Sequence, residues 1–246
     1  MKVLGVIPAR YQSSRLPGKP LADLLGKPMI QYVYEAASKA ATLSSVVVAT
    51  DDERIAQAVR GFGGEVVMTR VDHQSGTDRV AEVIADRDVS VVVNIQGDEP
   101  LLDPEMIDEC LNALAESDGA GLSTLMKPVN EEAFHDTGVV KVVCDLRGRA
   151  LYFSRSLIPF PRTKTLDLTV YEHVGLYAYT KDCLLRLSRL APSPLERIEG
   201  LEQLRALENG IPIQVAETRC TDELISVDTA EDLERVRAIL TRRGSN

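Results

Sequence analysis

The 246-residue sequence predicts an α/β protein with a mostly parallel sheet and helices on both of its faces. Apolar runs alternate with helical patterns through the first half of the chain, and this alternation is typical of a parallel sheet. The apolar runs are nearly continuous, as expected for strands that are buried on both faces. After the first strand there is neither a Gly-x-Gly-x-x-Gly fingerprint nor a Gly-Lys-Ser/Thr loop. These absences argue against a dehydrogenase or a Walker-type nucleotide site.

The order of elements follows from the spacing of apolar residues and from helix-start signals. Strands are expected at 3–7, 45–49, 65–68, 89–95 and 120–125, with helices at 29–41, 51–61 and 78–85 and another after Pro104. Right-handed crossovers would bring the loops that follow these strands to one edge of the sheet, where open α/β sheets bind ligands.

The middle of the chain departs from this rhythm. Strand-like segments at 139–144, 149–153 and 174–179 indicate an antiparallel lobe at about 130–190 within a single domain of residues 1–246. Ser193 and Pro194 open a helix that should end near Gly210. Strands at 213–216 and 226–228 and a last helix capped at Thr229 complete the chain.

Composition restricts the classes of function. A net charge of −9 argues against a general nucleic-acid binder. The four cysteines are far apart in the sequence, which fits reduced thiols and disfavours a zinc site or a disulfide framework. No signal peptide and no apolar run of membrane-spanning length are visible. We therefore expect a cytoplasmic protein with no membrane and no nucleic acid among its partners.

The loop that follows the first strand carries a cluster of cations. It reads Pro8-Ala9-Arg10 and then Arg15-Leu16-Pro17-Gly18-Lys19-Pro20 in a chain that is otherwise acidic. A solvated basic turn is the structural alternative, but Pro and Gly shape the loop rather than merely solubilise it. Arg10, Arg15 and Lys19 therefore indicate a polyanion such as a nucleotide triphosphate.

Two acidic residues are candidates for a metal site. Asp98 follows the strand at 89–95 within Gln96-Gly97-Asp98-Glu99-Pro100, and Asp228 precedes the last helix. Mg²⁺ commonly takes one or two protein carboxylates and fills its other positions with water and phosphate oxygens. Asp228 alone reads more simply as a turn or cap residue, so its role depends on the fold bringing it to Asp98.

Other polar residues are weaker candidates for ligand contacts. Ser75 and Arg79 lie where a helix begins, and either a helix cap or an anion site explains them. His173 and Tyr177 alternate on one strand with Gly175 between them, and Arg155 could hold a carboxylate with its two-pronged guanidinium. A structural role for His173, and surface positions for Glu202 and Gln203, are the alternatives.

Eight segments spread over essentially the whole chain carry a resemblance to a known family. Four of them are IPARYQSSRLPGKP at 7–20, ATDDERIA at 49–56, MTRVDHQSGTDR at 68–79 and NIQGDEP at 94–100. The others are ALYFSRSLIP at 150–159, HVGLYAY at 173–179, SPLERIEGLEQLR at 193–205 and SVDTAEDLERV at 226–236. In this order they resemble the 3-deoxy-D-manno-octulosonate (KDO) cytidylyltransferases, also called CMP-KDO synthetases.

The resemblance implies a Rossmann-like nucleotidyltransferase fold whose smaller antiparallel lobe binds the sugar and joins two subunits in a homodimer. It implies Mg²⁺-dependent transfer of CMP from CTP to KDO, with release of pyrophosphate, in lipopolysaccharide biosynthesis. Arg10, Lys19, Asp98 and Asp228 would be catalytic, and the two acids would bind the metal. The nucleotide would lie among Ala9, Arg10, Ser14, Arg15, Lys19, Gln74, Ser75 and Arg79. The sugar would lie among Gln96, Arg155, His173, Tyr177, Glu202 and Gln203.

Three alternatives stay open at this point. The acceptor could be a modified KDO such as an 8-amino form, or another acidic sugar such as a sialic acid. The sialic-acid enzymes carry a different first loop, without Arg-x-Pro-Gly-Lys. A non-catalytic nucleotide-binding module is the alternative from another class, and the presence of both Asp98 and Asp228 speaks against it. The residues alone lead only as far as a Mg²⁺-dependent nucleotide enzyme.

Overall fold

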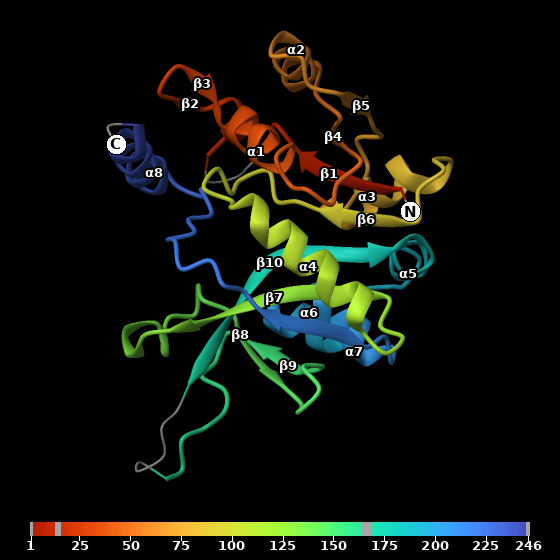
Figure 1. Cartoon of the computed structure of the whole chain (residues 1–246), viewed down its shortest axis with the longest axis vertical. Helices are drawn as coiled ribbons and strands as arrows, with labels where there is room; N and C mark the ends of the chain where they lie inside the picture. Colours follow the sequence, from red (N-terminus) through yellow and green to blue (C-terminus); the bar gives the residue numbers. More distant parts are fainter. Residues whose placement is uncertain (1, 13–15, 164–168, 245–246) are drawn as a thin grey trace. The chain divides into compact units, whose positions relative to one another are not determined.

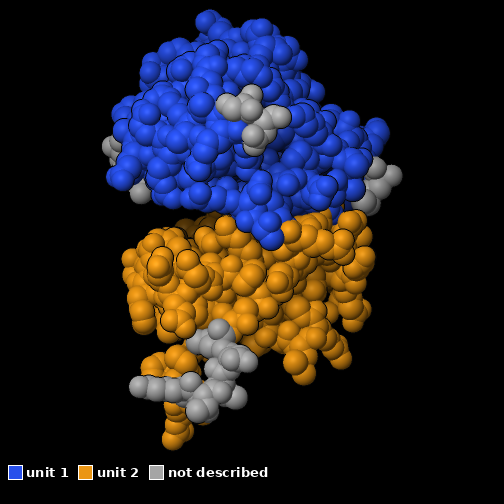
Figure 2. Space-filling model, turned by 60° about the vertical axis from the view of Figure 1, so that its left-hand side comes forward, with its two compact units in different colours: residues 1–108, 220–246 blue, residues 109–219 orange. Residues whose placement is uncertain are grey.

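The computed structural model describes residues 2–12, 16–163 and 169–244 of the chain. The fold comprises two compact units, drawn in different colours in Figure 2. The first unit is formed by Met1–Asp108 and Cys220–Asn246, and the second by Glu109–Arg219. The chain therefore leaves the first unit once and later returns to it.

A parallel sheet is the centre of the first unit. Its strands lie in the spatial order β6-β1-β4-β5. They are β1 (Val3–Ala9), β4 (Ser45–Thr50), β5 (Val66–Met68) and β6 (Val91–Asn94). The central strands are buried along nearly their whole length, as the continuous apolar runs predict.

Helices connect these strands (Figure 1). They are α1 (Met29–Ala37), α2 (Glu53–Gly61) and α3 (Gly76–Ala85). The connections through α1 and α2 step outward from β1 to β5, whereas the connection through α3 crosses back to β6. Right-handed crossovers therefore place α1 and α2 on one face of the sheet and α3 on the other. The predicted α/β class, with helices on both faces, is confirmed.

The second unit contains a mixed sheet. Strand β7 (Leu122–Val129) is parallel to β11 (Ile213–Glu217) and antiparallel to β10 (Val170–Thr180). Two further antiparallel strands, β8 (Lys141–Cys144) and β9 (Ala150–Ser154), extend from β10. The helices of this part are α5 (Lys181–Leu187), α6 (Pro194–Glu199) and α7 (Gln203–Glu208), and α4 (Pro104–Glu116) runs across the boundary between the units.

The structure corrects several details of the predicted elements. The single helix expected from Ser193 to Gly210 is two helices, because Gly200 adopts a left-handed conformation with φ 66° and ends α6. The segment at 226–228 is extended but is not a sheet strand. Helix α5 was not expected. Nor was the small hairpin of β2 (Asp23–Leu24) and β3 (Lys27–Pro28), whose turn holds Leu25 and Gly26 at positive φ.

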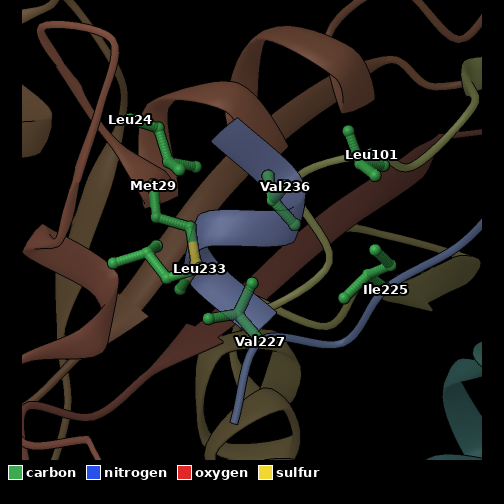
Figure 3. Close-up of a cluster of buried hydrophobic side chains, with 7 residues drawn as sticks. All are labelled: Leu24, Met29, Leu101, Ile225, Val227, Leu233 and Val236. Atoms are coloured by element: carbon green, nitrogen blue, oxygen red, sulfur yellow. The ribbon is translucent and has the colours of Figure 1, made fainter. Parts of the chain in front are cut away.

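The returning segment is anchored to the first unit by a hydrophobic cluster, shown in Figure 3. Helix α8 (Ala230–Gly244) lies beside the β2–β3 hairpin, and Arg237 Nη2 donates to Asp23 O over 2.6 Å (Figure 1). The cluster brings together side chains from the hairpin region, the loop after β6, the segment before α8 and α8 itself. Its members are Leu24, Met29, Leu101, Ile225, Val227, Leu233 and Val236. This packing fixes the position of Asp228, which lies between Val227 and the start of α8.

Within the described ranges, no helix combines the length and the apolar character needed to cross a membrane. All four cysteines lie in these ranges, and each is a thiol rather than half of a disulfide.

Truncation of Leu233 tests the cluster. Leu233 is 8% exposed, so Leu233→Ala should lower the free energy of unfolding by about 2–5 kcal/mol, through lost burial and the cavity left behind. Urea denaturation followed by circular dichroism would measure this loss. The matched control is Leu25→Ala, because Leu25 belongs to the same unit and is 53% exposed. Equal losses in the two variants would contradict the anchoring role of the cluster.

Candidate active site

The loop after β1 places Lys19 beside the two acids that the sequence singles out, Asp98 and Asp228. Gly18 adopts a left-handed conformation with φ 72°, and its N–H donates to Tyr11 O over 2.8 Å. A side chain at this position would be strained and would also press on the Tyr11 ring at 3.0 Å. Lys19 then begins a short 3-10 helix, Lys19–Leu21. Of the other predicted loop residues, Ser14 and Arg15 lie outside the described residues.

Asp98 and Asp228 converge on a single ammonium group. Lys19 Nζ lies 2.6 Å from Asp98 Oδ2 and 3.1 Å from Asp228 Oδ1. It also donates to Val227 O over 3.1 Å. An ammonium has three N–H donors, and these contacts engage all of them. Two acids that are 130 positions apart in the sequence (228 − 98) are thus neighbours in space.

The backbone explains why the acids meet. Asp98 follows β6, and Gly97 before it packs so closely on β1 that an added Cβ would lie 3.0 Å from Pro8 O. Gly97 therefore serves a close approach to the neighbouring strand, which a side chain would obstruct. Val227 N donates to Asp98 O over 2.9 Å, which joins the returning segment directly to the loop after β6.

The electrostatics of this triad favour a bound cation. Burial opposes the charge on Lys19, but Asp98 and Asp228 more than offset this effect and raise the pKa of the ammonium. The side chains of Asp98 and Asp228 stay 24% and 35% exposed, so both carboxylates can be reached from solvent. Two carboxylates with open positions fit Mg²⁺, which completes its shell with water and phosphate oxygens. Among the described residues there is no larger group of three His, Cys, Asp or Glu side chains that could hold a metal.

Arg10 is held by the loop that precedes α3. Its Nη2 donates to His73 O over 2.7 Å and its Nη1 to Gln74 O over 3.4 Å. The His73 imidazole in turn contacts the carboxylate of Glu82 on α3. Gln74 is exposed at the tip of the loop. The predicted nucleotide residues Arg10 and Gln74 therefore lie together.

Ser75 caps α3, as one of its two interpretations predicts. Asp78 N donates to Ser75 Oγ and Ser75 N donates to Asp78 Oδ2, each over 3.1 Å. Ala9 is buried at the end of β1. Both residues remain candidates for nucleotide contacts through their backbone.

Arg79 lies deeper than its predicted ligand role requires. Its side chain is fully buried; Nη1 donates to Thr69 Oγ1, and Nη2 lies 3.3 Å from Asp51 Oδ1. Burial lowers the pKa of the guanidinium, and the charge of Asp51 opposes this shift. In this structure Arg79 thus ties α3 to the ends of β4 and β5.

In the second unit, Arg155 is held on several sides. Its Nε donates to Glu199 O and its Nη1 to Thr137 O, each over 2.9 Å. Its main-chain N–H donates to the Glu199 carboxylate over 3.0 Å. Burial acts to raise the pKa of Glu199, but the hydrogen bonds it accepts from Arg155, Ser154 and Tyr152 outweigh burial and lower it.

His173 and Tyr177 lie together on β10, as predicted, with ring centroids 5.3 Å apart. A register shift between Val174 and Tyr177 interrupts the pairing of β10 with β7. Thr124 Oγ1 lies 3.0 Å from His173 Nε2 and also faces the carbonyls of Val174 and Leu176. Because a hydroxyl has one hydrogen, which goes to a carbonyl here, Nε2 of the imidazole is the donor. Burial lowers the pKa of His173 to about 3, so the ring is neutral.

The remaining predicted sugar residues are divided between the units. Gln96 lies in the loop after β6 of the first unit and is partly buried. Glu202 is the residue before α7, and Gln203 begins that helix and is buried. The surface interpretation of Gln203 is therefore wrong.

The sequence interpretation missed two charged residues around Arg155. Glu199 closes α6, and Lys141 is fully buried on β8. The available signal was a lone lysine within the valine-rich run Val139-Val140-Lys141-Val142-Val143.

Comparison with known proteins identifies the class of protein that this fold and site define. Residues 4–225 match the sequence family described as Cytidylyltransferase. The chain belongs to the cytidylyltransferase family, a class of nucleotidyltransferase enzymes.

Its relatives narrow this class. A protein of Syntrophotalea carbinolica named 3-deoxy-manno-octulosonate cytidylyltransferase is 55% identical over 98% of this chain and 99% of its own length. A protein of the same name from Geobacter sulfurreducens is 52% identical over 96% of this chain and 98% of its own. A solved structure of CMP:2-keto-3-deoxy-manno-octonic acid synthetase complexed with CTP matches with a TM-score of 0.93 and 45% identity, covering 99% of this chain and 100% of that one. Within its family, the chain groups with the 3-deoxy-manno-octulosonate cytidylyltransferases.

The neutral state of His173 has a measurable consequence. An imidazole in the unfolded chain titrates near 6.5, whereas His173 in the folded protein stays neutral down to about 3. Between these values the unfolded state takes up a proton that the folded state refuses, so His173 lowers stability as the pH falls through this window. NMR of the imidazole in the folded protein should show no titration between about pH 5 and 8. In denaturant, the same signal should titrate near its ordinary value; a folded-state midpoint there would contradict this account.

Proposed function

We propose that this protein transfers CMP from CTP to 3-deoxy-D-manno-octulosonate and releases pyrophosphate. The observation that carries the proposal is the convergence of Asp98 and Asp228 on Lys19 in a chain of this family. The names of relatives that are about half identical over nearly the whole chain supply the nucleotide and the sugar. The product would supply the sugar for lipopolysaccharide biosynthesis.

In the proposed reaction, a hydroxyl of the sugar attacks the α-phosphorus of CTP. A bond forms between that oxygen and phosphorus, the bond from phosphorus to the oxygen that bridges to the β-phosphate breaks, and the hydroxyl proton passes to solvent. The protein's task is to align these atoms and to stabilise the charge that builds up on the departing pyrophosphate. Arg10, Arg15 and Lys19 would stabilise that charge.

Asp98 and Asp228 would hold Mg²⁺. Such an ion, when bound, neutralises phosphate oxygens and lowers the pKa of a coordinated hydroxyl. Lys19 must change partners in this scheme, because its three donors are engaged by Asp98, Val227 and Asp228. It can donate to a triphosphate only by giving up at least one of these bonds. Lys19 thus offsets one of the two carboxylate charges in the free protein, and a divalent ion held by the two acids would free it for the nucleotide.

The remaining contacts are assigned by unit. In the first unit, Ala9, Ser14, Gln74, Ser75 and Arg79 would surround the nucleotide, and Gln96 would contact the sugar. In the second unit, Arg155 would bind the sugar carboxylate because a guanidinium matches that group with paired hydrogen bonds. Neutral His173 can offer Nδ1 as an acceptor to a hydroxyl. Tyr177, Glu202 and Gln203 would complete the sugar contacts.

We also propose a homodimer and a cytoplasmic location. The family resemblance assigns dimerisation to the antiparallel lobe at about 130–190. Several large apolar side chains of the second unit are exposed, which supports an interface there. They are Leu146, Leu151, Phe160, Leu195 and Ile198. The four thiols fit a reducing compartment.

A substrate panel tests the proposed function. Pyrophosphate release should require both CTP and KDO. It should be at least tenfold slower when UTP or ATP replaces CTP, or when a sialic acid replaces KDO. An 8-amino KDO is included because it is the nearest alternative acceptor. Faster release with that sugar than with KDO would make 8-amino KDO the acceptor. No release with any pair of substrates would favour a non-catalytic nucleotide-binding module.

Single substitutions test the two acids. Asp98→Asn and Asp228→Asn should each lower turnover by about 10²-fold or more, because each removes a charge that holds the metal and balances Lys19. The rate of pyrophosphate release at saturating Mg²⁺ measures this loss. Asp88→Asn is the matched control, since the Asp88 side chain is 92% exposed and pairs with Lys2 at 2.6 Å. Turnover near that of the unaltered protein in either acid variant would refute the assignment.

A further inference from the structure

The ammonium of Lys141 is buried in the second unit and bound to backbone carbonyls. The Lys141 side chain is fully buried. Its Nζ donates to Asp136 O over 2.5 Å, to Val139 O over 2.9 Å and to Arg155 O over 3.2 Å. These three acceptors satisfy all three donors of the group. The ammonium therefore joins the 136–139 turn to the residue that follows β9.

Such a lysine is costly for folding. Removing an ammonium from water is unfavourable. A protein with a well-packed apolar side chain at such a position is often at least as stable as one with a buried charge. Burial lowers the pKa of Lys141, in keeping with this cost, and the charges of Asp136 and Glu172 oppose the shift. Lys141 begins β8 and is followed there by Val142 and Val143, which shows that the strand accepts apolar residues. Stability of the sheet is therefore a poor explanation for this lysine.

The two groups that Lys141 joins are the groups that orient Arg155. One is the main chain of Arg155 itself. The other is the 136–139 turn, in which Thr137 O accepts from Arg155 Nη1 over 2.9 Å. Glu199 completes the arrangement from α6, because its carbonyl accepts from Nε and its carboxylate from the main-chain N–H of Arg155. Because Nε and Nη1 donate to carbonyls of two different segments, these hydrogen bonds fix the plane of the guanidinium.

We propose that Lys141 is a positioning residue that orients Arg155 for the carboxylate of the acidic sugar. This inference rests on the proposed function, in which Arg155 contacts the sugar. Lys141 itself touches no substrate in this scheme. It holds the turn and the Arg155 main chain in one arrangement, so that the guanidinium meets the carboxylate without first being ordered. A misplacement of about 1 Å at such a group can cost a factor of about 10².

The test separates the two substrates kinetically. Lys141→Met keeps the length of the apolar stem and removes the ammonium. It should raise the KM for KDO by about tenfold or more and leave the KM for CTP within about twofold. Lys127→Met is the matched control, since Lys127 lies on β7, which β10 separates from β8, and pairs with Glu172 at 3.6 Å. That variant should change neither KM.

A double-mutant cycle distinguishes positioning from general damage to the fold. If Lys141 acts through Arg155, its substitution should have almost no further effect on the KM for KDO in an Arg155→Ala background. Equal rises in both KM values, or additive effects of the two substitutions, would overturn the proposal. Should Lys141→Met not fold, Glu199→Gln is the second variant. It keeps the shape of the Glu199 side chain, removes the charge that holds the Arg155 main chain, and should also raise only the KM for KDO.

The failure of this inference can be told from the failure of the proposed function. A raised KM for KDO in Arg155→Ala, together with an unchanged one in Lys141→Met, would overturn the role of Lys141 alone. An unchanged KM for KDO in Arg155→Ala would remove Arg155 from the sugar site, and the role of Lys141 with it.

Discussion

The first unit is organised around two like charges that a single cation holds together. Asp98 and Asp228 both lie within hydrogen-bonding distance of Lys19 Nζ, and without a positive charge there the two carboxylates would repel each other. The surrounding features serve this meeting. Gly97 lets the loop after β6 approach β1, and Gly18 turns the first loop so that Lys19 faces the acids. The cluster around Leu233 brings the returning segment back.

This arrangement reconciles an acidic protein with an anionic substrate. The chain carries a net charge of −9, which would repel a triphosphate at long range. The first loop places positive side chains such as Arg10 and Lys19 at one point of this acidic chain. Lys19 is at once partner of the acids and candidate partner of the phosphates. Its ammonium offsets one of the two carboxylate charges, whereas a divalent ion would offset both. In the second unit, Arg155 is ordered by bonds to carbonyls and by Glu199, which places another fixed positive charge.

The sequence predicted the parallel strands and most helices because their patterns are local: continuous apolar runs for β1, β4 and β6, and a helix-start signal such as Ser75. It placed Asp98 and Asp228 correctly as strand-end and pre-helix acids, but their meeting depends on packing between distant segments, which no local pattern encodes. The break at Gly200 was missed because the helical pattern continues on both sides of it. The contacts of Lys141 and Glu199 with Arg155 were missed because they run through backbone carbonyls, and the only sequence signal was a lone lysine in a valine-rich run.

The interruption of the first unit by residues 109–219 affects how the protein is made. A ribosome builds the chain in order, and domains generally fold as they emerge. When Leu24, Met29 and Leu101 have been synthesised, the side chains that cover them in the finished protein do not yet exist. The whole second unit must be translated before Ile225 and Leu233 arrive. During this period the nascent enzyme exposes hydrophobic side chains and is therefore vulnerable to aggregation. It also lacks Asp228, so it is inactive.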